Sequence, residues 1–140
     1  MRRTVLSTLL VALAAASAVP ARAASRPEPE QQKIEYLLGQ VKASSATFIR
    51  NGKEYPASKA VSYLKGKLFF TGSHVQTARE FVVGVASRSE ESKQPYTMRL
   101  ADGRTLPVHD WLMERLSDYE TARGEGSHAA ETGAAAAPNP

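Results

Sequence analysis

The side chains in this sequence that could perform catalysis are its histidines, its serines and one acidic pair, Glu90-Glu91. His74 is the strongest candidate, because a histidine near a predicted helix start can exchange a proton or help backbone amides bind an anion. A serine hydrolase needs its nucleophile on a sharp turn, yet Ser87 lies in Gly-Val-Ala-Ser-Arg rather than in a Gly-x-Ser-x-Gly elbow. Spacing alone identifies no acid, base or nucleophile beside His74. We therefore assign no catalytic residue.

Metal and cofactor sites have no support in the sequence. The chain has no cysteine, no His-x-x-x-His pair and no Asp-x-Asp-x-Asp-Gly loop, which are the common ligand patterns for zinc and calcium. No glycine-rich phosphate-binding motif precedes a predicted helix. We expect neither a metal nor a cofactor.

The stretch Phe-Ile-Arg-Asn-Gly-Lys-Glu-Tyr, residues 48–55, suggests a binding site or a simple turn. Asn-Gly predicts a tight hairpin, because both turn residues must take positive φ angles. In the functional interpretation Arg50 grips an anionic group and Tyr55 stacks nearby. In the structural interpretation the turn geometry explains the motif, and this one is favoured. The candidate binding residues are Arg50, Asn51, Tyr55, His74 and Tyr96, and convergence on one cleft would favour a site.

The first 23 residues have the pattern of a cleavable secretory signal. Arg2 and Arg3 precede a mainly apolar run of 15 residues from Val5 to Val19, and Ala21-Arg22-Ala23 supplies small residues for cleavage near Ala23. The run is shorter than the roughly 20 residues that span a membrane. The sequence therefore predicts a periplasmic or secreted protein, with no transmembrane segment after signal cleavage.

The charge of the chain, formally +4, belongs mostly to this targeting segment. Cleavage after Ala23 would remove three arginines, so that eighteen basic residues fall to fifteen against fourteen acidic ones. Nucleic-acid binding normally needs a strong basic excess, so we expect none. A local basic stretch runs from Lys42 to Lys67, where a solvated face is the favoured interpretation and a weak anionic contact the other.

Four segments carry the apolar period of a helix: residues 31–44, 56–70, 73–89 and 108–122. The third has two competing capping boxes, Ser73 with Gln76 and Thr77 with Glu80, and the choice decides whether His74 lies in the helix or in the preceding loop. Two hairpins are expected over 47–55 and 96–108, around Asn-Gly and Asp-Gly turns. Because isolated hairpins are marginal in water, they should pair with each other or lie against the helices.

These elements define one small α+β domain that is mainly helical, with about four helices and two short β-hairpins. Its expected organisation is a signal peptide over 1–23, an extended lead-in over 24–30, the compact domain over 31–122 and a disordered Ala/Gly-rich tail over 123–140. No internal repeat is visible in the sequence.

The segments IEYLL, FIRNGKEY, TAREFV, ASRS, PYTMRLADG and WL, in this order, resemble a bacterial family of small exported proteins known only as a domain of unknown function. The resemblance covers roughly residues 34–116, and Phe-x-Arg-Asn-Gly-x-x-Tyr is its most specific part. It implies an exported soluble protein and no particular activity. Similar sequences often carry cysteines where this chain has Ala46 and, within a residue, Leu100. If those cysteines are bonded, the two hairpins should lie side by side.

Two classes of function remain open. The first is a non-enzymatic module that binds an envelope protein or an anionic envelope component, through the Arg50 hairpin and the basic stretch that follows it. The second is a small hydrolase or transferase that uses His74 with a serine or carboxylate brought near by folding. An accessory in stability or folding cannot be separated from the first class. The sequence does not indicate the partner or the oligomeric state.

Overall fold

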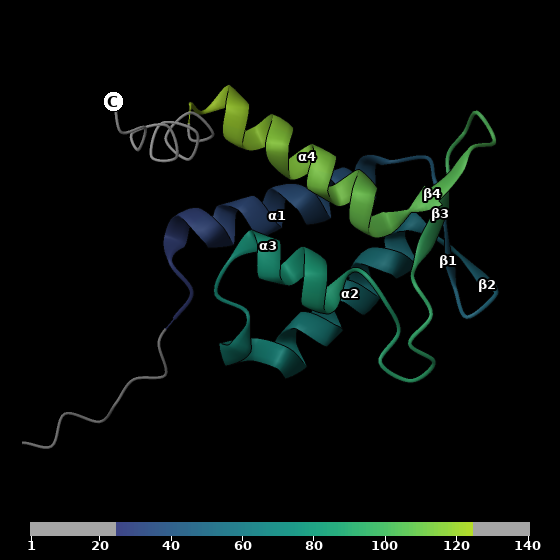
Figure 1. Cartoon of the computed structure of the whole chain (residues 1–140), viewed down its shortest axis with the longest axis horizontal. Helices are drawn as coiled ribbons and strands as arrows, with labels where there is room; N and C mark the ends of the chain where they lie inside the picture. Colours follow the sequence, from purple (N-terminus) through teal and green to yellow (C-terminus); the bar gives the residue numbers. More distant parts are fainter. Residues whose placement is uncertain (1–24, 125–140) are drawn as a thin grey trace, which may run out of the picture.

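The computed structural model describes residues 25–124, which form helices and one four-stranded antiparallel sheet (Figure 1). The helices are α1 (Glu28–Ala43), α2 (Ala57–Thr71), α3 (Ala78–Glu80) and α4 (Val108–Ala122), with a 3-10 turn η1 (Gly72–His74) and a π-helix η2 (Phe81–Val85). The strands are β1 (Thr47–Arg50), β2 (Lys53–Pro56), β3 (Thr97–Arg99) and β4 (Thr105–Pro107). The predicted fold class is therefore confirmed. The predicted signal peptide, and the predicted tail beyond residue 124, lie outside the described residues.

The two hairpins lie side by side in the sheet, whose strand order is β2-β1-β3-β4. The central pair, β1 and β3, is antiparallel and sets Phe48 opposite Met98 and Thr47 opposite Arg99. The same register continued by one residue sets Ala46 opposite Leu100. The side-by-side arrangement that the family resemblance implied is therefore confirmed.

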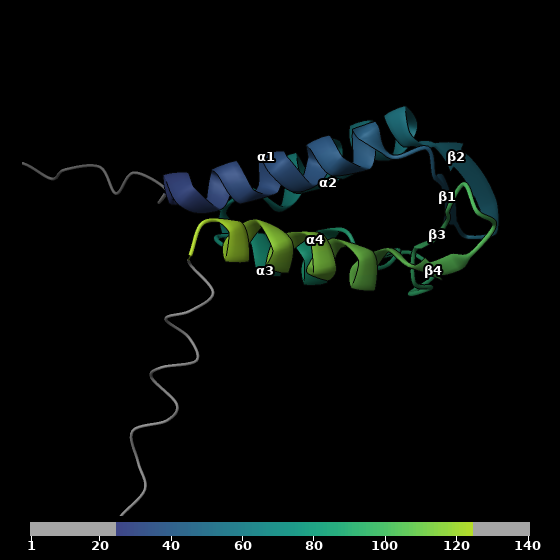
Figure 2. The same cartoon turned by 90° about the horizontal axis from the view of Figure 1, so that it is seen from above.

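The helices form two layers, and the sheet closes one end of them. Figure 2 shows α1 and α2 in one layer and α3 and α4 in the other, with both ends of the described chain at the end away from the sheet. The predicted stripe of α1, which ends at Val41, is buried, as are Leu64 of α2 and Leu112 of α4. These stripes meet Phe81 and Met98, both fully buried, in one hydrophobic core.

The element order repeats once along the chain. Each half contains a helical segment, a hairpin and a helix: α1, β1-β2 and α2 in the first, and α3 with η2, β3-β4 and α4 in the second. Both second helices have 15 residues and directly follow a proline, Pro56 or Pro107, which ends the preceding strand. No repeat is visible in the sequence, because the correspondence lies in the order of elements and not in residue identities.

Two expected boundaries were wrong. The expected extended lead-in over 24–30 is too long, because α1 begins at Glu28; Pro27 occupies the N-cap, Pro29 is accommodated in the first turn, and Glu28 and Glu30 suit the helix dipole. The helix expected over 73–89 spans only residues 78–85, and it widens after one α-turn into a π-helix closed by the Ala86 amide donating to the Phe81 carbonyl at 3.0 Å.

Of the two competing capping boxes, Thr77 with Glu80 begins the helix. The Thr77 hydroxyl accepts from the Glu80 amide at 3.1 Å, and the Glu80 carboxylate accepts from the Thr77 amide at 3.1 Å. His74 therefore lies before the helix, in η1. Over residues 25–124, no helix has the length and apolar content that crossing a bilayer would require.

Candidate functional site

A pocket of about 230 Å³ lies where the first hairpin meets α2. Three of the predicted binding residues, Arg50, Tyr55 and Tyr96, line it together with Lys59 and Tyr63. The rest of the lining is apolar: Phe48, Ile49, Ala60, Leu64, Ala86 and Val108. The pocket thus combines an apolar interior with one guanidinium and three phenol rings.

The strand geometry directs Arg50 and Tyr55 to the same face of the sheet. Side chains alternate along a strand, so Phe48 and Arg50 share a face of β1. The register sets Tyr55 opposite Phe48, and directly opposed residues lie on the same face. Because Phe48 is buried in the core, this face is the one turned toward the helices.

Tyr63, which comes from the middle of α2, forms the aromatic centre of the pocket. The Arg50 guanidinium carbon lies 4.6 Å from the Tyr63 ring centroid, within the range of a cation–π contact. The Tyr63 and Tyr96 rings meet edge to face, with centroids 6.2 Å apart and an interplanar angle of 83°. The Tyr96 hydroxyl donates to the Tyr63 hydroxyl at 3.3 Å.

Tyr96 is held in place by its backbone, and its ring is buried. Its amide donates to the Ser87 carbonyl at 2.9 Å, and its own carbonyl accepts from the Val108 amide at 3.0 Å. Burial raises the pKa of Tyr96 well above its ordinary value, and the contact with the Tyr63 hydroxyl raises it further, although Arg50 opposes the shift. Tyr96 therefore stays protonated, as a hydrogen-bond donor, at physiological pH.

The charge on Arg50 has little compensation from acidic groups. Glu91 is its ion-pair partner at 3.8 Å, but the Glu91 side chain is 82% exposed, and exposed pairs contribute little. The Arg50 Nε is buried and makes no hydrogen bond to any residue of 25–124. Burial alone would lower the pKa of Arg50, but the phenol oxygens around the guanidinium hold it above its usual value. The pocket therefore contains a permanent positive charge.

Asn51 connects the hairpin to the loop between η2 and β3 instead of lining the pocket. Its side-chain amide donates to the Ser89 hydroxyl at 3.5 Å, and its side-chain carbonyl accepts from the Ser92 hydroxyl. Ser89 is fully buried, so this contact anchors the loop. The loop carries Glu91, and Asn51 therefore helps to place the partner of Arg50.

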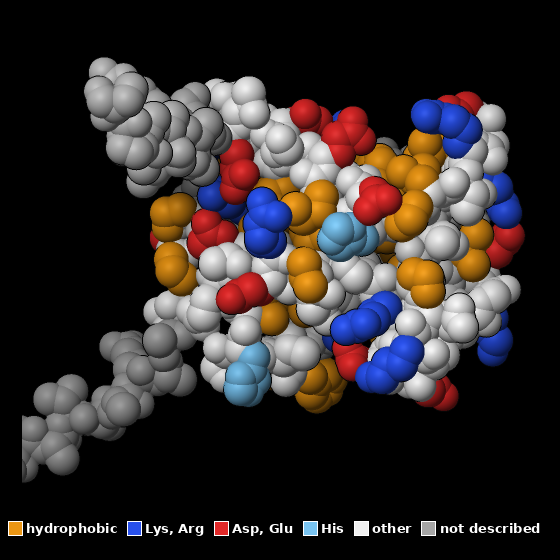
Figure 3. Space-filling view, viewed as in Figure 1, with side chains coloured by type: hydrophobic (Ala, Val, Ile, Leu, Met, Phe, Trp, Pro, Cys, Tyr) orange, Lys and Arg blue, Asp and Glu red, His pale blue; other side chains and the backbone are white. Residues whose placement is uncertain are grey.

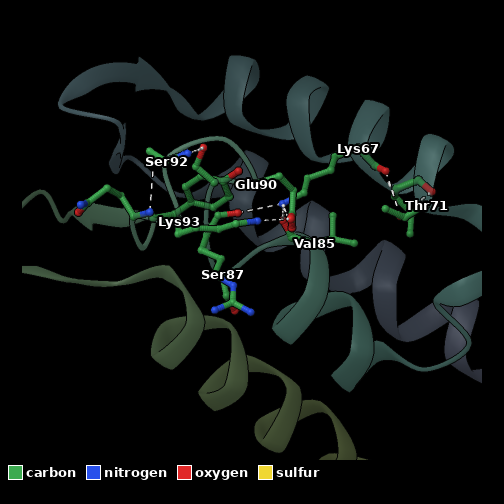
Figure 4. Close-up of polar contacts among 12 residues, drawn as sticks. Lys67, Thr71, Val85, Ser87, Glu90, Ser92 and Lys93 are labelled. Atoms are coloured by element: carbon green, nitrogen blue, oxygen red, sulfur yellow. Dashed lines mark hydrogen bonds and ion pairs between the residues drawn. The ribbon is translucent and has the colours of Figure 1, made fainter.

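Lys67, the last residue of the predicted basic stretch, points inward. Figure 4 shows its amine reaching from α2 to the end of η2, where it donates to the carbonyls of Val85 at 3.0 Å and Arg88 at 2.9 Å. The amine also lies 5.4 Å from the Tyr96 ring centroid. Lys67 therefore stabilises the wall of the pocket and is not part of an open basic surface.

His74 does not join the other candidates. It is exposed, and it lines a separate hollow with Thr71, Arg79 and Glu80. Within residues 25–124 the His74 ring makes no hydrogen bond or ion pair. Glu80, the carboxylate of that hollow, already accepts from the amides of Gln76 at 2.7 Å and Thr77.

The surface carries both signs of charge. Figure 3 shows basic and acidic side chains intermingled on the face seen in Figure 1. Two residues of the basic stretch have acidic partners in the loop between η2 and β3: Arg50 with Glu91 at 3.8 Å and Lys67 with Glu90 at 3.6 Å. The basic stretch is therefore interrupted in space by acidic groups from other segments.

Tyr63 is the pocket tyrosine that was not among the predicted binding residues. It lies three residues after Ala60 and four before Lys67, so helical spacing sets all three on adjacent turns at the border of the apolar stripe. This helical spacing could have indicated Tyr63 as a residue beside the apolar stripe. It does not show which residues of the sheet lie opposite that side of the helix.

Comparison with known proteins assigns the chain to a family. A family model described as a family of unknown function, DUF5329, matches residues 28–120, which include every residue of the pocket. The protein therefore belongs to this family. It is also similar to the uncharacterized protein YfeK of Salmonella typhimurium strain LT2, with 35% identity over 68 residues. That match covers 48% of this chain and 57% of YfeK, so it spans little more than half the length of the relative. No solved structure matches the chain significantly.

Proposed function

We propose that this protein is an exported, non-enzymatic binding module of the bacterial cell envelope, and that the pocket around Arg50 holds its ligand. The observation that carries the proposal is the meeting of Arg50, Tyr55 and Tyr96 in one pocket. They come from β1, β2 and the start of the second hairpin, more than forty residues apart at the extremes. A hairpin that served only as a turn would not need its arginine and tyrosine inside a cavity.

The chemistry of the pocket favours binding over catalysis. Arg50 keeps its proton in any protein environment, and Tyr96 holds its own because of burial, so neither is a base at neutral pH. Arg50 recognises an anion through charge and hydrogen bonds. The natural occupant is accordingly an anionic envelope component of low molecular mass, or an anionic group of a larger envelope partner.

The alternative, a hydrolase or transferase based on His74, has weaker support. General acid–base catalysis needs a second group within hydrogen-bond reach. The nearby carboxylate, Glu80, is engaged in capping α3. His74 also lies outside the pocket that the other candidates share.

Co-purification tests the binding function directly. Protein recovered natively from the host envelope is examined by native mass spectrometry, beside Ala60→Phe, which fills the pocket from α2, and Ala122→Phe, which adds the same ring to an exposed alanine of α4. We expect a bound small molecule on the wild type and on Ala122→Phe but not on Ala60→Phe. An identical ligand load on all three proteins, or none on any, would contradict the proposal.

The same samples test export. We expect the intact mass to correspond to a chain that begins near Ala24, since the signal pattern places cleavage near Ala23. A mature protein that retains Met1 would rule out cleavage. Crosslinking at Lys53 and Lys59 in intact cells then asks whether a larger partner approaches the hairpin beside the pocket.

A further inference from the structure

We propose that the ligand of the Arg50 pocket is a small carboxylate with a compact apolar body, either an aromatic acid or a short acyl chain. The inference rests on the proposed function and gives it a chemical class. It follows from three properties of the pocket: its size, its single cationic group inside an apolar lining, and the weak carboxylate that now faces that group.

The size of the pocket limits the apolar body. A cavity of about 150 Å³ lined by aliphatic and aromatic side chains takes up one benzene ring, about 25 Å³ per carbon atom. At that ratio the pocket, at about 230 Å³, holds about nine non-hydrogen atoms. A phenyl ring with a short chain fits this limit, and so does a chain of about eight carbons. A sugar would leave its hydroxyls unpaired against the apolar lining.

The guanidinium selects the head group. Arg50 presents a planar fork of N–H donors that matches the two oxygens of a carboxylate. The phenols around it are neutral, so the interior offers one full positive charge, to which exposed Lys59 adds a second at the rim. One interior charge balances a monoanion better than the double charge of a phosphate monoester.

Tyr63 supplies a further donor. Because the Tyr96 hydroxyl donates to the Tyr63 hydroxyl, the Tyr63 hydrogen is left to point at another acceptor. Tyr63 is 39% exposed and lines the pocket, so a ligand oxygen beside Arg50 is within its reach. The two tyrosines thus form a relay of hydrogen bonds that ends at the ligand head group.

Glu91 pairs with the Arg50 guanidinium from outside the pocket. Its carboxylate lies 3.8 Å from the Arg50 guanidinium, on a loop and largely in solvent. A ligand carboxylate in the pocket would replace it with shorter, more buried contacts. Glu91 is therefore a competitor for Arg50, and its removal should strengthen binding.

Calorimetric titration of the mature chain with 3-phenylpropanoate tests the class, and the neutral isostere 3-phenylpropanamide is the matched ligand. We expect the acid to bind at least about tenfold more tightly than the amide, because hydrogen bonds to charged groups contribute more. Octanoate should bind with an affinity similar to that of 3-phenylpropanoate. Inorganic phosphate, which has the charge without the apolar body, should not bind.

Two variants separate the roles of the charges. Arg50→Gln should weaken the binding of 3-phenylpropanoate until its affinity equals that of the amide. Glu91→Gln should tighten the acid about two- to fivefold, the range of an exposed ion pair, and leave the amide unchanged. Arg99→Gln is the control, because Arg99 pairs with Glu54 and does not line the pocket. Glu91→Gln keeps the test valid even where Arg50→Gln does not fold.

The outcomes distinguish this inference from the proposed function. Equal affinities for acid and amide, or a Glu91→Gln variant that weakens the acid, would overturn the carboxylate class. If phosphate bound as tightly as 3-phenylpropanoate, the inference that the ligand has an apolar body would be contradicted. Each of these leaves the co-purification result standing, and the absence of any co-purified ligand would instead remove the proposed function itself.

Discussion

Asn51 and Gly52 set the direction in which Arg50 points. Both residues have positive φ angles, 51° and 74°, which turn β1 directly into β2. The short turn fixes the register, and the register fixes which residues of β1 and β2 share a face. At the residue scale, the backbone conformation of the turn therefore determines that the Arg50 side chain lies on the face that lines the pocket.

The same substitution should have opposite effects at a glycine of the turn and at a glycine of a helix. Gly52→Ala should lower the free energy of unfolding by about 1 kcal/mol, because a side chain is strained at this positive φ although no atom lies within 4 Å of its Cβ. Gly39→Ala, in the interior of α1 and equally free of neighbours, should raise it by about 0.5–1 kcal/mol. Urea denaturation measures both, and a stabilised Gly52→Ala would refute the assigned turn.

The motif at 48–55 shows how far residue-level reasoning extends. Asn-Gly predicted the turn because few dipeptides tolerate two positive φ angles. The environment of Arg50 could not be predicted, because Tyr63 and Tyr96 reach it only through the docking of α2 and the pairing of β1 with β3. His74 was a plausible candidate by type and local position, and the same long-range packing separates it from the pocket.

At the scale of the elements, one ion-pair network joins three helices. Glu30 of α1 accepts from the Ala78 amide at the start of α3 at 2.7 Å and pairs with Lys33 at 3.0 Å. Lys33 in turn pairs with Glu120 of α4 at 3.2 Å. Burial alone would raise the pKa of Glu30, but the Ala78 amide and Lys33 more than offset it, and the pKa lies below its ordinary value.

Glu30→Gln should therefore destabilise the protein in a pH-dependent way. A carboxylate with a lowered folded-state pKa contributes stability above its unfolded pKa, near 4.5, and loses it as the pH falls through the folded value. We expect a loss of roughly 1–2 kcal/mol at pH 7 that shrinks below pH 4.5. Denaturation across pH measures it, with exposed Glu35→Gln as the control; a difference that is constant with pH would contradict this account.

The elements were predictable to different degrees. The bounds of α4 follow from Pro107 before it and from a clean apolar period. The start of α3 could not be predicted, because two capping boxes satisfy the same local rule. Only the tertiary contact of the Ala78 amide with Glu30 distinguishes them. The π-helix η2 has no sequence signal that we recognise; Ser87, which donates to the Val82 carbonyl, helps to satisfy its end.

At the scale of the whole molecule, the central pairing of β1 with β3 joins the two halves. Continued by one residue, its register sets buried Ala46 opposite partly buried Leu100. In this chain hydrophobic packing and the ladder of strand hydrogen bonds hold the halves together without a covalent link.

A double substitution tests this register. Ala46→Cys with Leu100→Cys should form a disulfide under oxidising conditions and raise the free energy of unfolding by about 2–4 kcal/mol over the reduced form, because it closes the long loop from residue 46 to residue 100. Thiol titration and denaturation with and without reductant measure it. Each single variant is the control, and thiols that stay free after oxidation would disprove the register.

The described chain enters and leaves at the end of the helices opposite the sheet, as Figure 2 shows. A preparation attached to a sensor chip or bead at either end of the described chain, residue 25 or residue 124, would consequently display the hairpins outward. Groups attached at these two ends would then lie away from the hairpin that lines the Arg50 pocket.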